Sequence, residues 1–179
     1  KWGIKYLHGV NISKISGIDL IPVLCSLAVK NKYKVYFLGG SRKVIERAVN
    51  NIKKSYKTLK IAGFSDGYFG IIDENLIKTK IKKAKPDILI VGMGQPKQEK
   101  WIFDNLNELK VPLSIGVGGS FDVISGKLKR APLIYQRSGL EWLFRLVQEP
   151  LRIMRIIKLI KFVMLIFIKK IIYQEEKNE

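Results

Sequence analysis

The sequence predicts an α/β fold with a Rossmann-like, mostly parallel sheet flanked by helices, followed by a C-terminal basic amphipathic helical appendage. Short apolar runs of strand length alternate with segments of helical periodicity, which is the order typical of a parallel sheet. Two of these runs, residues 87–91 and 111–117, end in glycines followed by polar side chains, as strands do at a ligand crevice. From residue 139 onward a continuous helical pattern replaces the alternation.

The expected elements follow one another along the chain with short connections. Strands are expected at residues 34–38, 59–63, 87–91 and 111–117, and helices at 16–30, 41–54, 75–83, 97–109 and 139–172. Ser16 and Asp19 resemble a capping box at the first helix, and Pro96 suits the first position of the fourth. A break is expected near Pro150, whereas residues 1–15 show no clean period.

The composition fits one domain with an appendage, which we place at residues 1–138 and 139–179. A hydrophobic content of 47% argues against disorder, and a net charge of +18 favours nucleic acid, anionic lipid or phosphorylated ligands as partners. The single cysteine, Cys25, excludes a disulfide framework and is expected in the core. The single histidine, His8, offers no triad or metal site, and no Asp-x-Asp pair is present to hold a divalent cation on a diphosphate.

Polar residues after the strand at 87–91 form the first candidate site. Gly94 lets the backbone approach a ligand, and Lys97, Gln98 and Glu99 occupy the first turn of the following helix. The Gln98 amide both donates and accepts hydrogen bonds, as recognition of a base or a sugar requires. Glu99 either contacts the ligand as well or is only a favourable charge at the helix start.

A second candidate site follows the strand at 111–117. Gly118 and Gly119 precede Asp122, which binds ribose hydroxyls, acts as a base, or only stabilises a turn. The basic residues beyond it (Lys127, Lys129 and Arg130) either grip phosphate or form a solvated loop. Gly39 and Gly40 offer a third site, where amides at a helix start favour phosphate; the alternative is an ordinary tight turn.

The tail is basic on one side and apolar on the other. Residues 151–174 contain six basic side chains and no acid, while isoleucines and other apolar residues recur at helical spacing. The longest uncharged run, residues 162–168, is too short to span a bilayer. We therefore expect an amphipathic helix on an anionic membrane surface, the alternative being a helix packed on the domain.

Taken together, these segments resemble the WecG/TagA/CpsF family of bacterial glycosyltransferases over nearly the whole chain. The resemblance runs through Ser16-Gly17-Ile18-Asp19-Leu20, Phe37-Leu38-Gly39-Gly40, Gly67-Tyr68-Phe69, Gly92-x-Gly94-x-Pro96-Lys97-Gln98-Glu99, Gly116-Val117-Gly118-Gly119-Ser120-Phe121-Asp122, Lys129-Arg130-Ala131-Pro132 and Leu140-Glu141-Trp142-Leu143-Phe144-Arg145-Leu146-x-Gln148-Glu149-Pro150. The ordered set is specific, although each piece alone is not.

The resemblance implies a function for each part of the chain. It implies inverting, metal-independent transfer of N-acetylmannosamine or a related sugar, without a cofactor, from a UDP-sugar to an N-acetylglucosamine diphospho-polyprenol lipid. Residues 1–138 would bind the nucleotide-sugar, and residues 139–179 would hold the protein peripherally at the cytoplasmic face of the bacterial cell membrane. The product would feed teichoic acid or other cell-surface polysaccharides, and an oligomer is compatible with this role.

The resemblance also assigns residues. Arg145, Arg152 and Arg155 match appendage arginines that are thought to hold substrate phosphate in the family. The family's Asp-Gly motif, which carries the proposed catalytic base, has no counterpart here, so we expect the base outside these residues and poor transfer by this chain alone. A usual arginine of the family is Lys14 in this sequence.

Two other functions remain open at this point. One is a catalytically silent fragment or partner subunit that binds nucleotide-sugar. The absence of the family's catalytic base from these residues favours this alternative. The other is a nucleic-acid-binding protein, suggested by the charge of +18. Against it, the chain has no recognition motif, and its tail pairs basic residues with an apolar face rather than with stacking aromatics.

Deleting residues 151–179 is expected to abolish sedimentation with anionic liposomes. Each Lys or Arg near such a surface contributes about 1 kcal/mol of attraction, which salt screens. The apolar face inserts into the membrane and adds hydrophobic binding energy that salt does not screen. Binding of the full chain should therefore weaken with salt without disappearing. A deleted protein that still sediments as the full chain does would contradict the assignment.

Overall fold

The computed structural model describes residues 2–10, 15–150, 162, 164–166 and 168. The chain divides into two compact units, one formed by residues 15–129 and the other by residues 1–14 together with 130–179. Each unit is described by itself below.

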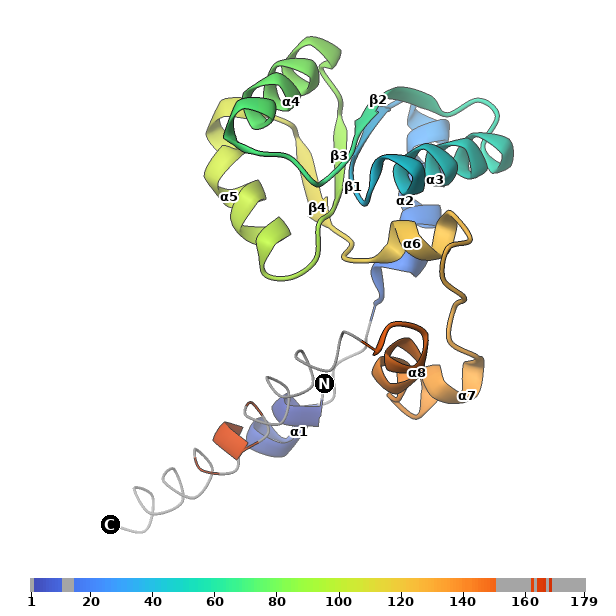
Figure 1. The fold of residues 1–179 in the computed structure, drawn as a ribbon, viewed down its shortest axis with the longest axis vertical. Coiled ribbons are helices and arrows are strands. Elements are labelled where there is room, and N and C mark those ends of the chain that lie inside the picture. The colour runs from blue at the N-terminus through green and yellow to red at the C-terminus, as the bar shows by residue number, and fades with distance from the viewer. Residues whose placement is uncertain (1, 11–14, 151–161, 163, 167, 169–179) are drawn as a thin grey trace. The chain divides into compact units, whose positions relative to one another are not determined.

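The 15–129 unit is built on a four-stranded parallel sheet. Its strands are β1 (Lys34–Gly39), β2 (Lys60–Ser65), β3 (Ile88–Gly92) and β4 (Leu113–Gly116), in the spatial order β2-β1-β3-β4 (Figure 1). The two central strands are buried almost throughout, which explains their continuous apolar sequences. The predicted Rossmann-like α/β class is confirmed.

Helices cover both faces of this sheet because successive strand side chains point to opposite sides. Val35, Phe37 and Ile90 face a core shared with α2 (Gly17–Asn31), α3 (Arg42–Ser55) and α6 (Ser120–Ile124). The alternate side chains, such as Leu38 and Val91, face a second core with α4 (Ile71–Ala84) and α5 (Lys97–Leu109). Figure 1 shows α4 and α5 on one side of the strands and α2, α3 and α6 on the other.

Most of the expected elements in this unit are present, with corrections at their ends. β2 runs on to Ser65, and α4 begins at Ile71 rather than near residue 75, which places Asp73 and Glu74 in its first turn. Carboxylates there are favoured by the helix dipole. The short helix α6 was not expected, because five residues are too few for a helical period to show.

Two predicted helix starts differ in detail. Ser16 is the N-cap of α2 as expected, but its hydroxyl donates to the Asp19 carboxylate instead of capping a backbone amide. Pro96 is the N-cap of α5 rather than its first residue, and the Gln95–Pro96 peptide bond is cis. Both helices start within about one residue of the predicted position; the Ser16 hydrogen bond and the N-cap place of Pro96 were not predicted.

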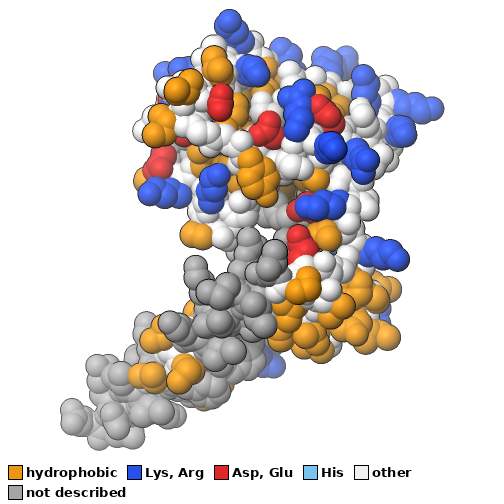
Figure 2. All heavy atoms as spheres, in the orientation of Figure 1, with side chains coloured by type: hydrophobic (Ala, Val, Ile, Leu, Met, Phe, Trp, Pro, Cys, Tyr) orange, Lys and Arg blue, Asp and Glu red, His pale blue; other side chains and the backbone are white. Residues whose placement is uncertain are grey.

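Cys25 lies fully inside the first core, as predicted. Burial raises the pKa of its thiol to about 11, since the thiolate would lose its hydration. Among the residues that the structure describes, no Lys, Arg, Asp or Glu side chain is buried. On the face shown in Figure 2, Lys and Arg side chains are spread over the 15–129 unit with acidic side chains between them.

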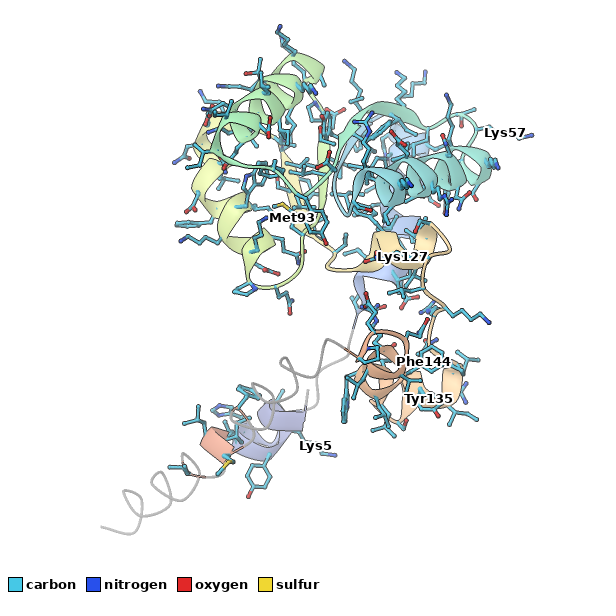
Figure 3. The ribbon with its side chains drawn as sticks, viewed as in Figure 1. Lys5, Lys57, Met93, Lys127, Tyr135 and Phe144 are labelled. Atoms are coloured by element: carbon cyan, nitrogen blue, oxygen red, sulfur yellow. The ribbon has the colours of Figure 1, made fainter. Side chains whose placement is uncertain are left out.

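The other unit contains three described helices, α1 (Trp2–His8), α7 (Leu133–Arg137) and α8 (Glu141–Gln148). Tyr135 and Phe144 pack with ring centroids 5.5 Å apart and join α7 to α8 (Figure 3). The sequence predicted neither α1 nor α7, whereas α8 confirms the start of the expected C-terminal helix. Most of the predicted tail helix lies outside the described residues, although residues 162, 164–166 and 168 are helical.

No helix among the described residues is long and apolar enough to cross a membrane. The assignment of residues 1–138 to nucleotide-sugar binding and of 139–179 to membrane association stays a prediction.

Replacing Gly39 with alanine is expected to destabilise the 15–129 unit strongly. Gly39 has φ +139°, and a Cβ there would press against the Gly92 carbonyl of β3. Backbone strain and overpacking each cost about 1–3 kcal/mol, so we expect a loss of at least about 2 kcal/mol in urea unfolding.

Gly70→Ala is the matched control for this variant. A Cβ at Gly70 meets nothing within 4 Å, and its φ of −87° suits any residue. We expect a change within about 1 kcal/mol, because the weaker N-cap offsets the lower entropy of the unfolded chain. Equal effects of the two substitutions would contradict the close packing of β1 against β3.

Candidate functional site

The carboxyl edge of the sheet carries the candidate site. The chain leaves β1 toward β2 on one side and returns to β3 and β4 on the other, so the strand order reverses between β1 and β3. Ligands of open α/β sheets bind outside the carboxyl ends of the strands at such a reversal. The turns after β1, β2, β3 and β4 all lie at this edge because the strands are parallel.

Gln98 joins two of these turns. Its side chain is 1% exposed, and its Oε1 accepts a hydrogen bond of 2.9 Å from the Gly118 amide. Its Nε2 donates to Glu99 Oε1 at 2.8 Å. A Cβ on Gly116 would lie 2.5 Å from Gln98 Nε2, so the glycine makes room for the glutamine. The first turn of α5 is therefore fixed to the turn that follows β4.

Glu99 and Lys97 are exposed at the start of α5. Lys97 donates to the Gly67 carbonyl at 3.3 Å, and its ammonium lies 5.4 Å from the centre of the Phe69 ring. It thus ties α5 to the loop after β2, and its expected role toward a ligand stays a prediction. In the described part of the chain, Glu99 has Gln98 as its hydrogen-bonding partner and forms no ion pair.

The Gly39-Gly40 turn is closed by backbone contacts. The Gly40 amide donates to the Gly92 carbonyl at 3.0 Å, and the Gly40 carbonyl accepts from the Gly67 amide at 2.8 Å. These contacts fit a tight strand-to-helix turn, and phosphate binding at Gly39-Gly40 stays a prediction. Gly94, by contrast, faces open space where a side chain would begin. Met93 beside it marks the end of β3 in Figure 3.

Asp122 lies in the short helix α6, which follows the Gly118-Gly119 turn in the sequence. Its Oδ1 accepts from Lys127 Nζ at 3.1 Å, and its backbone carbonyl accepts from the Leu128 amide. The carboxylate therefore helps to hold the loop that follows α6, which is the turn-stabilising role weighed above. Binding of a ribose by Asp122 stays a prediction.

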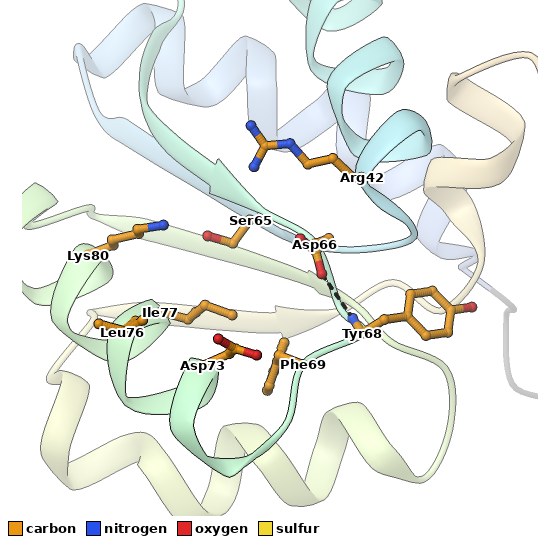
Figure 4. Close-up of a pocket in the computed structure, with 9 residues that line it drawn as sticks. All are labelled: Arg42, Ser65, Asp66, Tyr68, Phe69, Asp73, Leu76, Ile77 and Lys80. Atoms are coloured by element: carbon orange, nitrogen blue, oxygen red, sulfur yellow. Dashed lines mark hydrogen bonds between the residues drawn. The ribbon is translucent and has the colours of Figure 1, made fainter.

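A pocket of about 300 Å³ opens beside the end of β2 (Figure 4). Its lining combines cations, carboxylates, a hydroxyl group, two aromatic rings and two aliphatic side chains: Arg42, Ser65, Asp66, Tyr68, Phe69, Asp73, Leu76, Ile77 and Lys80. Tyr68 is 80% exposed, and its amide donates to Asp66 Oδ1 within a tight turn. Such a lining suits a ligand that carries both hydroxyl groups and negative charge.

Buried hydrogen bonds support the wall of this pocket. Ser65 shares a hydrogen bond of 2.8 Å with the buried Tyr36 hydroxyl, and burial raises the pKa of Tyr36 although the Ser65 contact lowers it. Phe69 packs edge-on against Trp101, whose indole donates to Glu74 at 2.9 Å. The loop after β2 is thereby fastened to α4 and α5.

The sequence did not single out these pocket residues as a site. The loop at 65–70 was recognised as turn-rich, and Gly67-Tyr68-Phe69 was noted only as part of the family resemblance. The pocket depends on the early start of α4 at Ile71, which brings Asp73 to this edge. Apolar periodicity does not show where a helix begins after a short loop, so the sequence carries no clear signal for this site.

The arginines expected to hold phosphate lie elsewhere in the chain. Arg130 and Arg145 belong to the other unit, where Arg130 donates to Gln136 Oε1 at 3.2 Å. Arg152 and Arg155 lie outside the described residues. No group of three or more histidine, cysteine, aspartate or glutamate side chains that could hold a metal ion occurs in the described ranges.

Comparison with known proteins identifies relatives over most of the chain. The sequence model of the glycosyl transferase WecG/TagA/CpsF family matches residues 1–176. The N-acetylglucosaminyldiphosphoundecaprenol N-acetyl-β-D-mannosaminyltransferase of Bacillus subtilis is 38% identical over 93% of this chain and 62% of its own length. A protein of the same name from Staphylococcus aureus is 38% identical over 80% of this chain and 56% of its own. The chain thus spans about three fifths of these relatives.

Removing either partner of the buried Tyr36–Ser65 hydrogen bond is expected to lower stability by about 1 kcal/mol, since the other hydroxyl is left unpaired. Tyr36→Phe and Ser65→Ala should each show this loss in urea unfolding. The double variant should lose less than the sum, because it leaves no unpaired group. Additive losses would mean that the two hydroxyls do not depend on each other.

Proposed function

The chain belongs to the WecG/TagA/CpsF family of glycosyl transferases, and we propose that it transfers N-acetylmannosamine, or a related sugar, from a UDP-sugar to an N-acetylglucosamine diphospho-polyprenol lipid. One observation carries this proposal: 38% identity over 93% of the chain to a transferase whose name specifies that sugar and that acceptor. The product would enter teichoic acid or a related cell-surface polymer.

The carboxyl edge of the sheet supports the proposal. Gly94 is open to a ligand, and Glu99 exposes a carboxylate that can accept hydrogen bonds from sugar hydroxyls. The pocket beside β2 adds Asp66 and Asp73 for hydroxyls, with Arg42 and Lys80 for negative charge. These groups suit the two halves of a nucleotide-sugar, which has hydroxyl-rich rings joined through a diphosphate.

We propose an inverting displacement for the reaction. The acceptor hydroxyl attacks the anomeric carbon, loses its proton to a base, and expels UDP from the opposite face. The departing UDP gains negative charge, which positively charged side chains offset. Lys97 at the carboxyl edge and the appendage arginines, Arg145, Arg152 and Arg155, are the residues proposed for this role.

The absence of an Asp-x-Asp pair in the sequence supports a reaction that does not depend on a metal ion. The lipid acceptor and the basic tail support action at a membrane surface, which we place at the cytoplasmic face. An anionic surface would attract the tail, while the hydroxyl-recognising edge of the sheet serves the donor.

The chain is expected to bind UDP and UDP-N-acetylmannosamine in calorimetry, with the same affinity in EDTA as in magnesium. The cations that stabilise the diphosphate are side chains of the protein, so chelation should change nothing. With a short-chain N-acetylglucosamine diphospho-polyprenol acceptor, mass spectrometry should detect the disaccharide lipid in small amounts only, because the family's base-bearing motif has no counterpart in this sequence.

Each outcome of this experiment decides between functions. Binding lost on chelation would overturn the metal-independent mechanism. Nucleotide binding without any product would favour a partner subunit that binds nucleotide-sugar without catalysis. Failure to bind either nucleotide would overturn the proposed function itself.

A further inference from the structure

Gln98 is an unusual residue for its environment. It is the least exposed of the buried polar side chains among the described residues, at 1%, yet it lies at the edge of the sheet where ligands bind. Burying an amide without partners is costly, whereas an apolar side chain of similar size would fill the same space without that cost. The hydrogen bonds that Gln98 makes therefore matter more than its volume.

Both ends of the Gln98 amide are used within the protein. The oxygen accepts from the Gly118 amide at 2.9 Å, and the nitrogen donates to Glu99 Oε1 at 2.8 Å. An amide side chain can do both, whereas an ionised carboxylate accepts without donating and an ammonium donates without accepting. The chemistry of this position is thus matched to its two neighbours.

Glu99 is the exposed member of this group. Its carboxylate is held through one oxygen by Gln98, and the other oxygen has no hydrogen-bonding partner among the described residues. The residue stands in the first turn of α5. Lys97 and Lys100, the nearby cations on the same helix, are both exposed. The Glu99 side chain therefore offers an oriented hydrogen-bond acceptor to the solvent at the carboxyl edge.

We propose that Gln98 is a positioning residue, which holds the Glu99 carboxylate and the Gly118 turn in one arrangement so that Glu99 accepts hydrogen bonds from hydroxyl groups of a sugar ring in the nucleotide-sugar. This inference rests on the proposed function. Gln98 itself acts through Glu99 and Gly118. The ring is either the ribose or the transferred sugar, which share this hydroxyl chemistry.

Gln98→Glu tests the arrangement without any ligand. The introduced carboxylate is nearly the same size and can still accept from Gly118, but it faces Glu99 where the amide donated. Two like charges in contact raise the pKa of the pair in the folded state above its unfolded value, so the folded state binds more protons. The melting temperature of the variant, relative to wild type, should therefore rise as the pH falls from 8 to 5.

Asn107→Asp is the matched control. It adds one negative charge at an exposed position on the same helix, without a carboxylate facing it across a hydrogen bond. Its melting temperature relative to wild type should change less over the same pH range. If the two variants respond to pH equally, the Gln98–Glu99 hydrogen bond does not hold the carboxylate, and the inference is overturned.

Ligand binding tests the second half of the inference. At pH 8, Gln98→Glu should bind UDP-N-acetylmannosamine about tenfold more weakly than wild type, the loss expected for one hydrogen bond to a charged group. Affinity should recover toward pH 5, where a protonated carboxyl group donates in place of the amide. Glu99→Gln should also bind more weakly, but without this recovery.

The double variant Gln98→Glu with Glu99→Gln reverses the direction of the hydrogen bond and should bind better than Gln98→Glu alone at pH 8. A purely structural role would lower the melting temperature of Gln98→Glu and leave affinity unchanged, which overturns the inference. Comparison with UDP identifies the ring: weaker binding of both ligands assigns the ribose, and weaker binding of the sugar nucleotide alone assigns the transferred sugar.

The experiment also separates this inference from the proposed function. If the wild-type chain binds neither UDP nor UDP-N-acetylmannosamine, the proposed function fails and the assignment of a sugar ring fails with it. The stability measurements would still report whether Gln98 holds Glu99. If the wild type binds both ligands and the variants bind them equally well, only the inference fails.

Discussion

The ends of β1 and β3 lie so close together that no side chain fits between them. A Cβ on Gly39 would overlap the Gly92 backbone, and the Gly40 amide donates a hydrogen bond to the Gly92 carbonyl. The loop after β2 then closes on the same turn through the Gly67 amide. Since these contacts are between backbones, they fix the turns at this edge with little freedom. The positions of α3, α4 and α5, and of the side chains on their first turns, depend on them.

A second set of contacts joins the remaining strand to this centre. Gln98 fills the space left by the missing side chain of Gly116 and holds the Gly118 turn, while Lys97 reaches the loop after β2. The first turn of α5 is thereby connected to the turns after both β2 and β4. The result is a well-connected edge at which Glu99 is exposed and Gly94 faces open space, a combination that suits recognition of a polar ligand.

The strands and long helices could be predicted from the sequence because their periodicity is carried by many residues. β1 and β3 are almost entirely buried, and α3 presents a regular apolar face of Val44, Ile45, Ala48, Val49 and Ile52. Short elements and hydrogen-bond partners could not be predicted. Helices α1, α6 and α7 have five to seven residues, which is too few to show a helical period. The Ser16 hydroxyl donates to the Asp19 carboxylate rather than capping a backbone amide, a detail that the sequence motif does not determine.

The sequence by itself determined the α/β class, the family, and the strand ends at which Gly94, Gln98 and Asp122 stand. These follow from apolar periodicity and from ordered motifs, which are local properties of the chain. Only the tertiary structure decided which of these polar groups face each other. It buried Gln98 between Gly118 and Glu99, paired Asp122 with Lys127, and gathered Arg42, Asp73 and Lys80 around one pocket. The Gln98–Gly118 contact and the pocket join residues far apart in sequence, so they depend on how the helices pack across the sheet, and no local pattern contains that information.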